Sequence, residues 1–103
     1  MLKGKTALVT GSTSGIGLGI AEALAAKGAD VMLNGFGEAD AITGLQKRIA
    51  EQFGVKVGYD GADLSKPDQI KTLVEHATAE LGKIDILVNN AGIQFTAPIE
   101  EFP

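Results

Sequence analysis

The sequence predicts an α/β fold in which helices cover both faces of one parallel sheet. Three observations predict it. Short apolar runs alternate with segments of helical periodicity in the order β-α-β-α-β-α-β. Glycines gather at the ends of the apolar runs, where tight loops join strands to helices. A glycine-spaced turn leads from the first apolar run into the first helical segment, as in the first half of a doubly wound, Rossmann-type sheet. We therefore expect right-handed crossovers and the strand order 3-2-1-4.

Four nearly continuous apolar runs are expected to form the strands, and their lack of alternation indicates burial on both faces of the sheet. They span residues 6–9, 30–34, 55–59 and 84–89. Hydrophobic residues make up 45% of the 103-residue chain, which is enough for one folded domain with a modest core.

Three segments between the runs are expected to be helices, because each carries apolar residues three or four positions apart. They span residues 16–27, 38–53 and 66–81. Each segment is followed by a glycine that provides a natural end for the helix: Gly28, Gly54 and Gly82. The third helix also has Pro67 in its first turn, and Ser65 and Asp68 stand at the spacing of a capping box.

The glycine turn joins the first strand to the first helix and reads Thr10-Gly11-Ser12-Thr13-Ser14-Gly15-Ile16-Gly17. It leaves backbone N–H groups at a helix N-terminus, which is a binding site for an anion such as a pyrophosphate. Gly11 permits the tight exit from the strand, Gly15 lets the backbone approach the phosphates, and Gly17 lets the helix lie close to the sheet. The hydroxyls of Ser12, Thr13 and Ser14 can donate to phosphate oxygens. An ordinary glycine-rich turn is the alternative, whereas a Walker A loop is excluded because no Gly-Lys-Ser/Thr follows.

Composition excludes several classes of site and partner. Lys and Arg number 9 against 13 Asp and Glu, and the net charge of −4 disfavours binding to nucleic acid. The absence of cysteine and the single histidine, His76, exclude thiolate and multi-histidine metal sites. His76 lies off the apolar stripe of its helix, so we expect it to be solvated. With no signal peptide, no apolar stretch of roughly 20 residues and no basic amphipathic face, we expect a cytoplasmic protein without a membrane partner.

Two further segments make the glycine turn more specific. Asn89-Asn90-Ala91-Gly92 ends the fourth apolar run, and Ala62-Asp63-Leu64-Ser65 follows the third. With these segments the sequence resembles the short-chain dehydrogenase/reductase family along almost the whole chain. The resemblance implies an oxidoreductase that passes a hydride between a nicotinamide cofactor and a small substrate.

The resemblance also implies roles for individual residues in binding the cofactor. Those that match the family's pyrophosphate loop are Gly11, Gly15, Ile16 and Gly17. Those that match the segment lining the adenine ribose and approaching the nicotinamide are Asn90, Ala91 and Gly92. The carboxylate of Asp63, with Leu64 beside it, matches the contact to the adenine amino group; a loop or helix-capping aspartate is the alternative. Asn89 matches a residue that ties neighbouring strands together by side-chain hydrogen bonds.

The end of the second strand predicts the choice between NAD and NADP. Members of the family that use NAD usually carry an acidic residue there, and members that use NADP a basic one. This chain has Asn34-Gly35-Phe36-Gly37, which is neither. No cation stands at Ser12, Thr13, Ser14 or Phe36 to neutralise a 2′-phosphate. That phosphate would lose its water without compensation. We therefore expect NAD, with Gly35 and Phe36 packing on the adenosine. For Phe36 alone, a loop aromatic that covers the sheet edge is the alternative.

The substrate is predicted from the segment that follows the fourth strand. Residues 89–94, together with residues 33–37 and 59–64, resemble the family members that oxidise the small 3-hydroxy acid 3-hydroxybutyrate to acetoacetate. In those members the matching glutamine binds the substrate carboxylate, so the resemblance assigns this role to Gln94. A polar loop residue is the alternative for Gln94. Another reductase of the family, acting on a sugar, a steroid or an acyl carrier, is the alternative for the function.

The family's catalytic serine, tyrosine, lysine and asparagine have no counterpart in residues 1–103. Tyr59 does not open the family's Tyr-x3-Lys motif, since position 63 is Asp63, and we expect Tyr59 to end the third strand. We therefore expect the chain to be the N-terminal, adenosine-binding part of a homo-oligomeric, tetrameric enzyme, and to be inactive as residues 1–103 alone. A non-catalytic nucleotide-binding module is the second class of interpretation.

Overall fold

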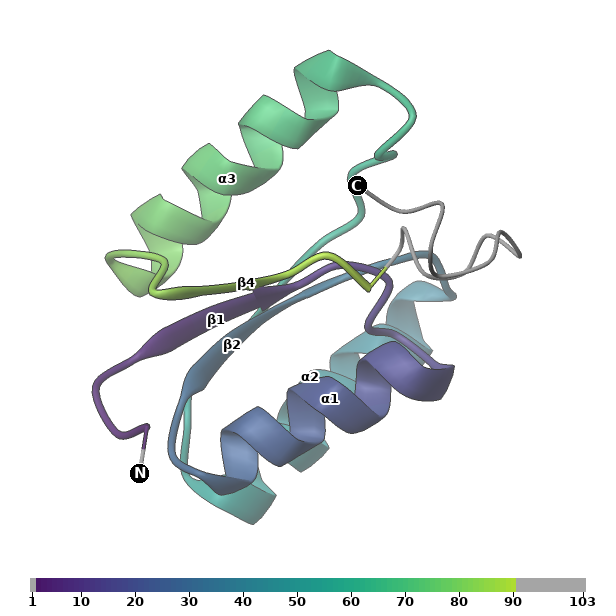
Figure 1. The fold of residues 1–103 in the computed structure, drawn as a ribbon. Coiled ribbons are helices and arrows are strands. Elements are labelled where there is room, and N and C mark those ends of the chain that lie inside the picture. Colours follow the sequence, from purple (N-terminus) through teal and green to yellow (C-terminus); the bar gives the residue numbers. More distant parts are fainter. Residues whose placement is uncertain (1, 91–103) are drawn as a thin grey trace, which may run out of the picture.

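The computed structural model describes residues 2–90 and confirms the predicted order of elements. The strands are β1 (Thr6–Val9), β2 (Asp30–Asn34), β3 (Val57–Asp60) and β4 (Ile86–Val88), and the helices are α1 (Gly15–Ala26), α2 (Ala39–Phe53) and α3 (Pro67–Leu81). The four strands form one parallel sheet in the predicted order β3-β2-β1-β4. Helices α1 and α2 lie on one face of this sheet and α3 lies on the other (Figure 1).

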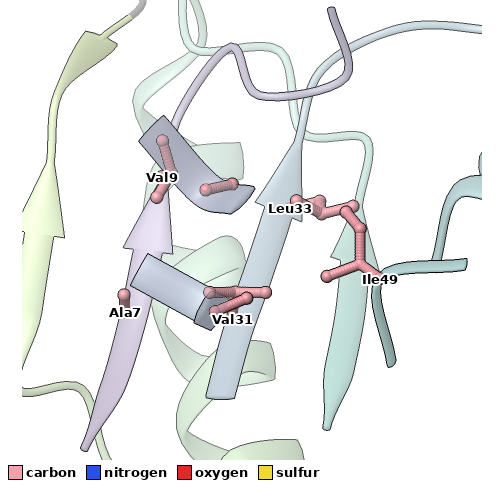
Figure 2. Close-up of a cluster of buried hydrophobic side chains, with 7 residues drawn as sticks. Ala7, Val9, Val31, Leu33 and Ile49 are labelled. Carbon is pink, nitrogen blue, oxygen red and sulfur yellow. The ribbon is translucent and has the colours of Figure 1, made fainter. Parts of the chain in front are cut away.

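Alternate residues of the two central strands supply two separate cores, because successive side chains of a strand point to opposite faces. On the α1 and α2 face, residues of β1 and β2 pack with small residues of α1 and with Ile49 of α2 (Figure 2). On the α3 face, Leu8 and Met32 pack with Leu73 and Ala77 of α3. The apolar runs of the two central strands, β1 and β2, are therefore buried on both sides as predicted, whereas β4 is not fully buried, since Leu87 is 63% exposed.

Two strands differ in length from the prediction because side chains replace ladder bonds at their ends. The backbone N–H of Lys56 donates to the Asp30 carboxylate (2.9 Å) and not to a strand carbonyl, so β3 begins at residue 57 instead of 55. It then extends to Asp60, which pairs with Asn34. At the start of β4, the Asp85 carboxylate accepts from the N–H of Thr6 (2.9 Å), and the strand begins only at residue 86.

The helices end where the glycines predict, and their starts differ in detail. Gly54 follows α2 with a left-handed φ of 68°, and Gly82 follows α3 with a φ of 93°. The predicted capping box before α3 is wrong: the Ser65 hydroxyl donates to the Asp63 carboxylate (2.7 Å), and Lys66 occupies the N-cap position without a side-chain bond. None of the helices in residues 2–90 combines the length and the hydropathy of a membrane span.

Candidate functional site

The loops that follow the four strands meet at the carboxyl edge of the sheet, where they border a cavity of about 720 Å³. This volume lies within the range of ordinary ligand sites, roughly 300–1,000 Å³. Seven of the residues predicted to bind the cofactor line the cavity: Gly11, Thr13, Ser14, Gly35, Phe36, Asp63 and Leu64. Open parallel sheets bind their ligands at this edge, beside the point where the strand order reverses. Here that point lies between β1 and β4.

The glycine turn (residues 10–17) presents bare backbone at the start of α1. Gly11 and Gly15 both adopt a φ of 60°, which side chains rarely permit. A Cβ on Gly15 would meet no atom within 4 Å, so the space above this residue is open. A Cβ on Gly17 would lie 2.1 Å from the carbonyl oxygen of Gly11, so glycine here lets α1 approach the turn itself. No acidic residue occupies the first turn of α1, and its N–H groups therefore favour an external anion.

Of the three hydroxyl groups in the turn with a predicted role at phosphate, two bond to the protein itself and one is available to a ligand. Ser12 is buried, donates to the carbonyl of Val9 (2.7 Å) and accepts from the N–H of Asn34 (3.0 Å), so its predicted role as a phosphate donor is wrong. The Thr13 hydroxyl donates to the carbonyl of Phe36 (3.0 Å), although Thr13 lines the cavity. Ser14 caps α1 through its extended backbone and makes no side-chain cap bond, so its hydroxyl can serve a ligand.

The loop between β2 and α2 is held against the glycine turn. A Cβ on Gly35 would lie 2.5 Å from the Thr13 hydroxyl oxygen, and the φ of Gly35 is 150°. The Tyr59 hydroxyl donates to the carbonyl of Gly35. Phe36 follows with 72% of its surface exposed at the cavity wall, where it can cover a planar ligand. Among residues 2–90, neither a lysine nor an arginine lines this cavity.

Asp63 lies on the cavity wall in the loop between β3 and α3. Its Oδ1 accepts from the backbone N–H (2.9 Å) and the hydroxyl (2.7 Å) of Ser65, and these bonds lower the pKa of the carboxyl. Its own N–H donates to Oε1 of Gln69 (2.7 Å), which fixes the loop to α3. An ionised, oriented carboxylate can accept a hydrogen bond from an amino group in the cavity. The same two bonds to Ser65 also fit the alternative, an aspartate that only stabilises its own loop. These bonds occupy Oδ1 and leave Oδ2 for a ligand.

The two asparagines after β4 both tie this segment to the glycine turn. The Thr10 hydroxyl lies 3.3 Å from Oδ1 of Asn89, and Nδ2 of Asn90 donates to the carbonyl of Gly11 (3.1 Å). Asn90 is buried, so the structural tie that the sequence assigned to Asn89 is shared by both residues. The predicted site residues Ala91, Gly92 and Gln94 lie outside the described residues.

Sequence reasoning missed the role of Asn34, the last residue of β2. Its side chain is buried, its Oδ1 accepts from the N–H of Gly11 (3.2 Å), and its Nδ2 donates to the carbonyls of Asp60 (3.0 Å) and Ala62 (3.1 Å). It therefore connects loops from three neighbouring strands. The available signal was a polar residue at the end of an otherwise apolar strand, because a buried amide needs partners for all its polar atoms.

His76 is partly solvated, as predicted, with 41% of its side chain exposed, but it also makes two contacts that the sequence did not predict. Its Nδ1 lies 2.7 Å from Oδ2 of Asp60, and its Nε2 lies 2.8 Å from Oε2 of Glu80. The hydrogen bond to Asp60 is the main cause of a raised pKa at His76. The other carboxylate oxygen of Asp60 accepts from the N–H of Ala62 (2.8 Å), so the pair joins α3 to the loop that carries Asp63.

Comparison with known proteins is consistent with this arrangement. The profile of the family described as short chain dehydrogenase matches residues 5–103. The chain is 58% identical over 103 residues to D-beta-hydroxybutyrate dehydrogenase of Cupriavidus necator, covering all of this chain and 39% of that protein. It is 44% identical over 101 residues to gluconate 5-dehydrogenase of Gluconobacter oxydans, covering 98% of this chain and 39% of that protein. The chain thus spans about two fifths of the length of these relatives.

A solved structure shows the same fold. The L-sorbose reductase of Gluconobacter frateurii, complexed with NADPH and L-sorbose, superposes with a TM-score of 0.82 at 38% identity. The match covers 99% of this chain and 38% of the reductase. The order and packing of the elements described above are therefore those of the first part of that enzyme's fold.

Proposed function

Because the chain belongs to the short-chain dehydrogenase family, we propose that it binds the adenosine diphosphate part of NAD in an oxidoreductase acting on 3-hydroxybutyrate. NAD, when bound, would accept the hydride and yield acetoacetate. One observation carries the proposal: the glycine turn and Asp63 border a single cavity at the carboxyl edge of the sheet. An anion site and an acceptor for an amino group thus lie in one space, as an adenine nucleotide requires.

The glycine turn is proposed to bind the pyrophosphate. The backbone N–H groups of Gly15, Ile16 and Gly17 begin α1, and the positive end of the helix dipole favours a negative group. Ile16 is 76% exposed, so the described residues leave the side chain at this end of the helix open. The Ser14 hydroxyl, which makes no cap bond, adds a donor beside these amides.

Asp63 and Phe36 are proposed to bind the adenosine. The Asp63 carboxylate accepts from the adenine amino group, while Ser65 holds it in orientation. The exposed ring of Phe36 and the apolar side chain of Leu64 supply contact surface. Asn90, Ala91 and Gly92 complete the site toward the ribose by the family resemblance.

Selectivity for NAD over NADP is proposed from the loop after β2. The described residues that line the cavity include no lysine or arginine, so a 2′-phosphate would find no cation among them. The Thr13 hydroxyl, a nearby donor, already serves the carbonyl of Phe36. The reductase with the similar structure binds NADPH, so cofactor choice is a property to be measured in this chain and not one inherited from the family.

The substrate assignment draws on the relatives and on Gln94. The hydroxybutyrate dehydrogenases of Cupriavidus necator and Rhizobium meliloti are 58% and 48% identical to the chain. We propose that the Gln94 amide donates to the substrate carboxylate. The serine, tyrosine, lysine and asparagine that perform proton transfer in the family have no counterpart in residues 1–103, so we propose that these residues alone are inactive.

Calorimetric titration of the natural polypeptide that contains residues 1–103 tests the cofactor proposal. We expect AMP and NAD to bind, and NADP to bind at least about tenfold more weakly because its extra phosphate is desolvated without a cation. Asp63→Asn retains an acceptor for Ser65 but removes the charge, and should weaken AMP binding about tenfold. Asp68→Asn, the same change at an exposed position nearby, is the matched control. A folded protein that binds neither AMP nor NAD would refute the proposal.

Steady-state kinetics with the same polypeptide test the substrate. We expect NAD-dependent oxidation of 3-hydroxybutyrate, and Gln94→Ala should raise KM for this carboxylate substrate more than it lowers kcat. An uncharged secondary alcohol turned over by both forms serves as the control substrate. If the protein oxidises a sugar acid such as gluconate and does not turn over 3-hydroxybutyrate, the substrate proposal is refuted and the cofactor proposal stands.

A further inference from the structure

The neighbours of the Asn34 side chain determine how its amide is oriented. Its Nδ2 faces two carbonyl oxygens, those of Asp60 and Ala62, and its Oδ1 faces the N–H of Gly11. Only this orientation of the amide satisfies all three partners. Asn34 is 2% exposed, so water does not replace any partner that is lost.

The three partners belong to, or directly precede, the two segments that form the proposed nucleotide site. Gly11 begins the glycine turn, which is proposed to bind the pyrophosphate. Asp60 and Ala62 flank the start of the adenine loop (residues 61–66), which carries Asp63. The backbone of Asn34 adds two bonds to the turn, since its N–H donates to the Ser12 hydroxyl and its carbonyl accepts from the Ser12 N–H (2.6 Å).

We propose that Asn34 is a positioning residue that holds the glycine turn and the adenine loop at a fixed separation, and thereby sets the affinity for adenine nucleotides. The inference rests on the proposed function, because it concerns the same site. Asn34 is not among the residues proposed to contact the cofactor. It acts through its bonds to the backbone of Gly11 and Ala62. Because Asp63 directly follows Ala62, these bonds also set how far Asp63 lies from the glycine turn, and we infer that this separation suits adenosine diphosphate.

Asn34→Asp isolates the donor half of this amide with almost no change in shape. The carboxylate still accepts from the N–H of Gly11, but it turns an oxygen toward the carbonyls of Asp60 and Ala62. The buried carbonyl of Ala62 and the partly buried carbonyl of Asp60 then lose their donor and face a negative charge. We expect the adenine loop to move away from the turn and the affinity for AMP to fall about tenfold or more at pH 8.5.

Gln46→Glu is the matched control. The Gln46 amide also donates to a carbonyl of β3, that of Val57 (3.1 Å), and it is partly buried, whereas Asn34 is fully buried. Val57 begins β3, whereas Asp60 ends it at the site. The control therefore removes an amide donor from another carbonyl of β3 and adds the same charge at a position away from the proposed nucleotide site. We expect its AMP affinity to remain within about twofold of the wild-type value.

The pH profile separates positioning from a general loss of structure. Burial beside two carbonyls raises the pKa of the new carboxyl in Asn34→Asp. Below that pKa its protonated form regains one O–H donor, so AMP affinity should recover toward the wild-type value at pH 5.5. Asp60 and His76, the titratable pair that joins β3 to α3 beside the adenine loop, are present in every variant. The wild-type profile over the same pH range subtracts their contribution.

The outcomes distinguish this inference from the proposed function. A wild-type protein that does not bind AMP refutes the proposed function and the inference with it. A wild-type protein that binds AMP, with equal affinity in a folded Asn34→Asp at both pH values, overturns the inference alone. Circular dichroism verifies folding, and if Asn34→Asp does not fold, Asn34→Thr removes the three bonds without burying a charge. Weakened AMP binding by folded Asn34→Thr supports the inference, and loss of folding in both variants overturns it in favour of a purely structural role.

Discussion

Gly35 illustrates how one missing side chain shapes the site. Its φ of 150° is strained for any residue with a Cβ, and that Cβ would lie 2.5 Å from the Thr13 hydroxyl oxygen. The hydroxyl cannot withdraw freely, because it donates to the carbonyl of Phe36. The close contact between the glycine turn and the loop after β2 thus depends on glycine at this position.

Gly35→Ala should therefore lower the free energy of unfolding by about 1–3 kcal/mol, through backbone strain and the clash with Thr13. Urea denaturation measures the change. Gly44→Ala is the control of opposite sign: its Cβ meets no atom within 4 Å, and alanine in the middle of α2 should stabilise by about 0.5–1 kcal/mol. Equal stability of Gly35→Ala and the wild type would show that the two loops are not held as tightly as described.

The residues of the site that could be predicted are those whose role is local. The glycine spacing identifies the turn because a tight exit and a bare helix start need glycine at set intervals along the chain. Asn34, Ser12 and His76 could not be assigned in this way. Their partners are residues of neighbouring strands or helices, and the sequence does not state which polar atoms a fold brings together.

At the scale of elements, α3 is joined to β3 by the pair of His76 and Asp60, and this junction depends on pH. His76 bonds to Asp60 on one side and Glu80 on the other, and its pKa is raised mainly by Asp60. A raised folded-state pKa means that protonated His76 contributes stability below its unfolded pKa of about 6.5. That contribution is lost as the pH rises through the folded-state pKa.

His76→Gln should accordingly destabilise the protein more at pH 5.5 than at pH 9. The difference in unfolding free energy between the two proteins, measured by urea denaturation across this range, should shrink as pH rises. Glu75→Gln, a change at an exposed neighbour on α3, should give a difference that varies little with pH. A constant difference for His76→Gln would mean that the histidine acts only by packing.

The elements themselves could be predicted almost completely, and the errors fall at their ends. Apolar periodicity and terminal glycines locate all seven elements of residues 2–90, since burial and helix termination are encoded within each segment. The starts of β3 and β4 were misplaced because Asp30 and Asp85 accept bonds that a strand carbonyl would otherwise take. Such side-chain substitutes depend on the neighbouring strand, which is not evident from the segment alone.

At the scale of the whole molecule, the sheet has one apolar side that the described residues leave partly open. Strand β4 pairs only with β1 among the strands of residues 2–90. Leu87 of β4 is 63% exposed, and Ile70 and Val74 of α3 are each 41% exposed beside the same cavity. An edge strand flanked by exposed apolar side chains is a site for association with another chain.

We therefore expect the isolated polypeptide of residues 1–103 to self-associate through this edge, and Leu87→Lys to shift it toward the monomer. A charge on the edge strand opposes pairing because it would be buried in the contact. Sedimentation velocity at several concentrations measures the distribution of monomer and oligomers.

Ala79→Lys is the control, since it adds the same charge at an exposed position of α3, on the opposite side of the helix from Ile70. It should leave the distribution of monomer and oligomers unchanged. If Leu87→Lys and the wild type sediment alike as oligomers, association uses another surface, and if the wild type is monomeric, the exposed edge is not sufficient to drive it.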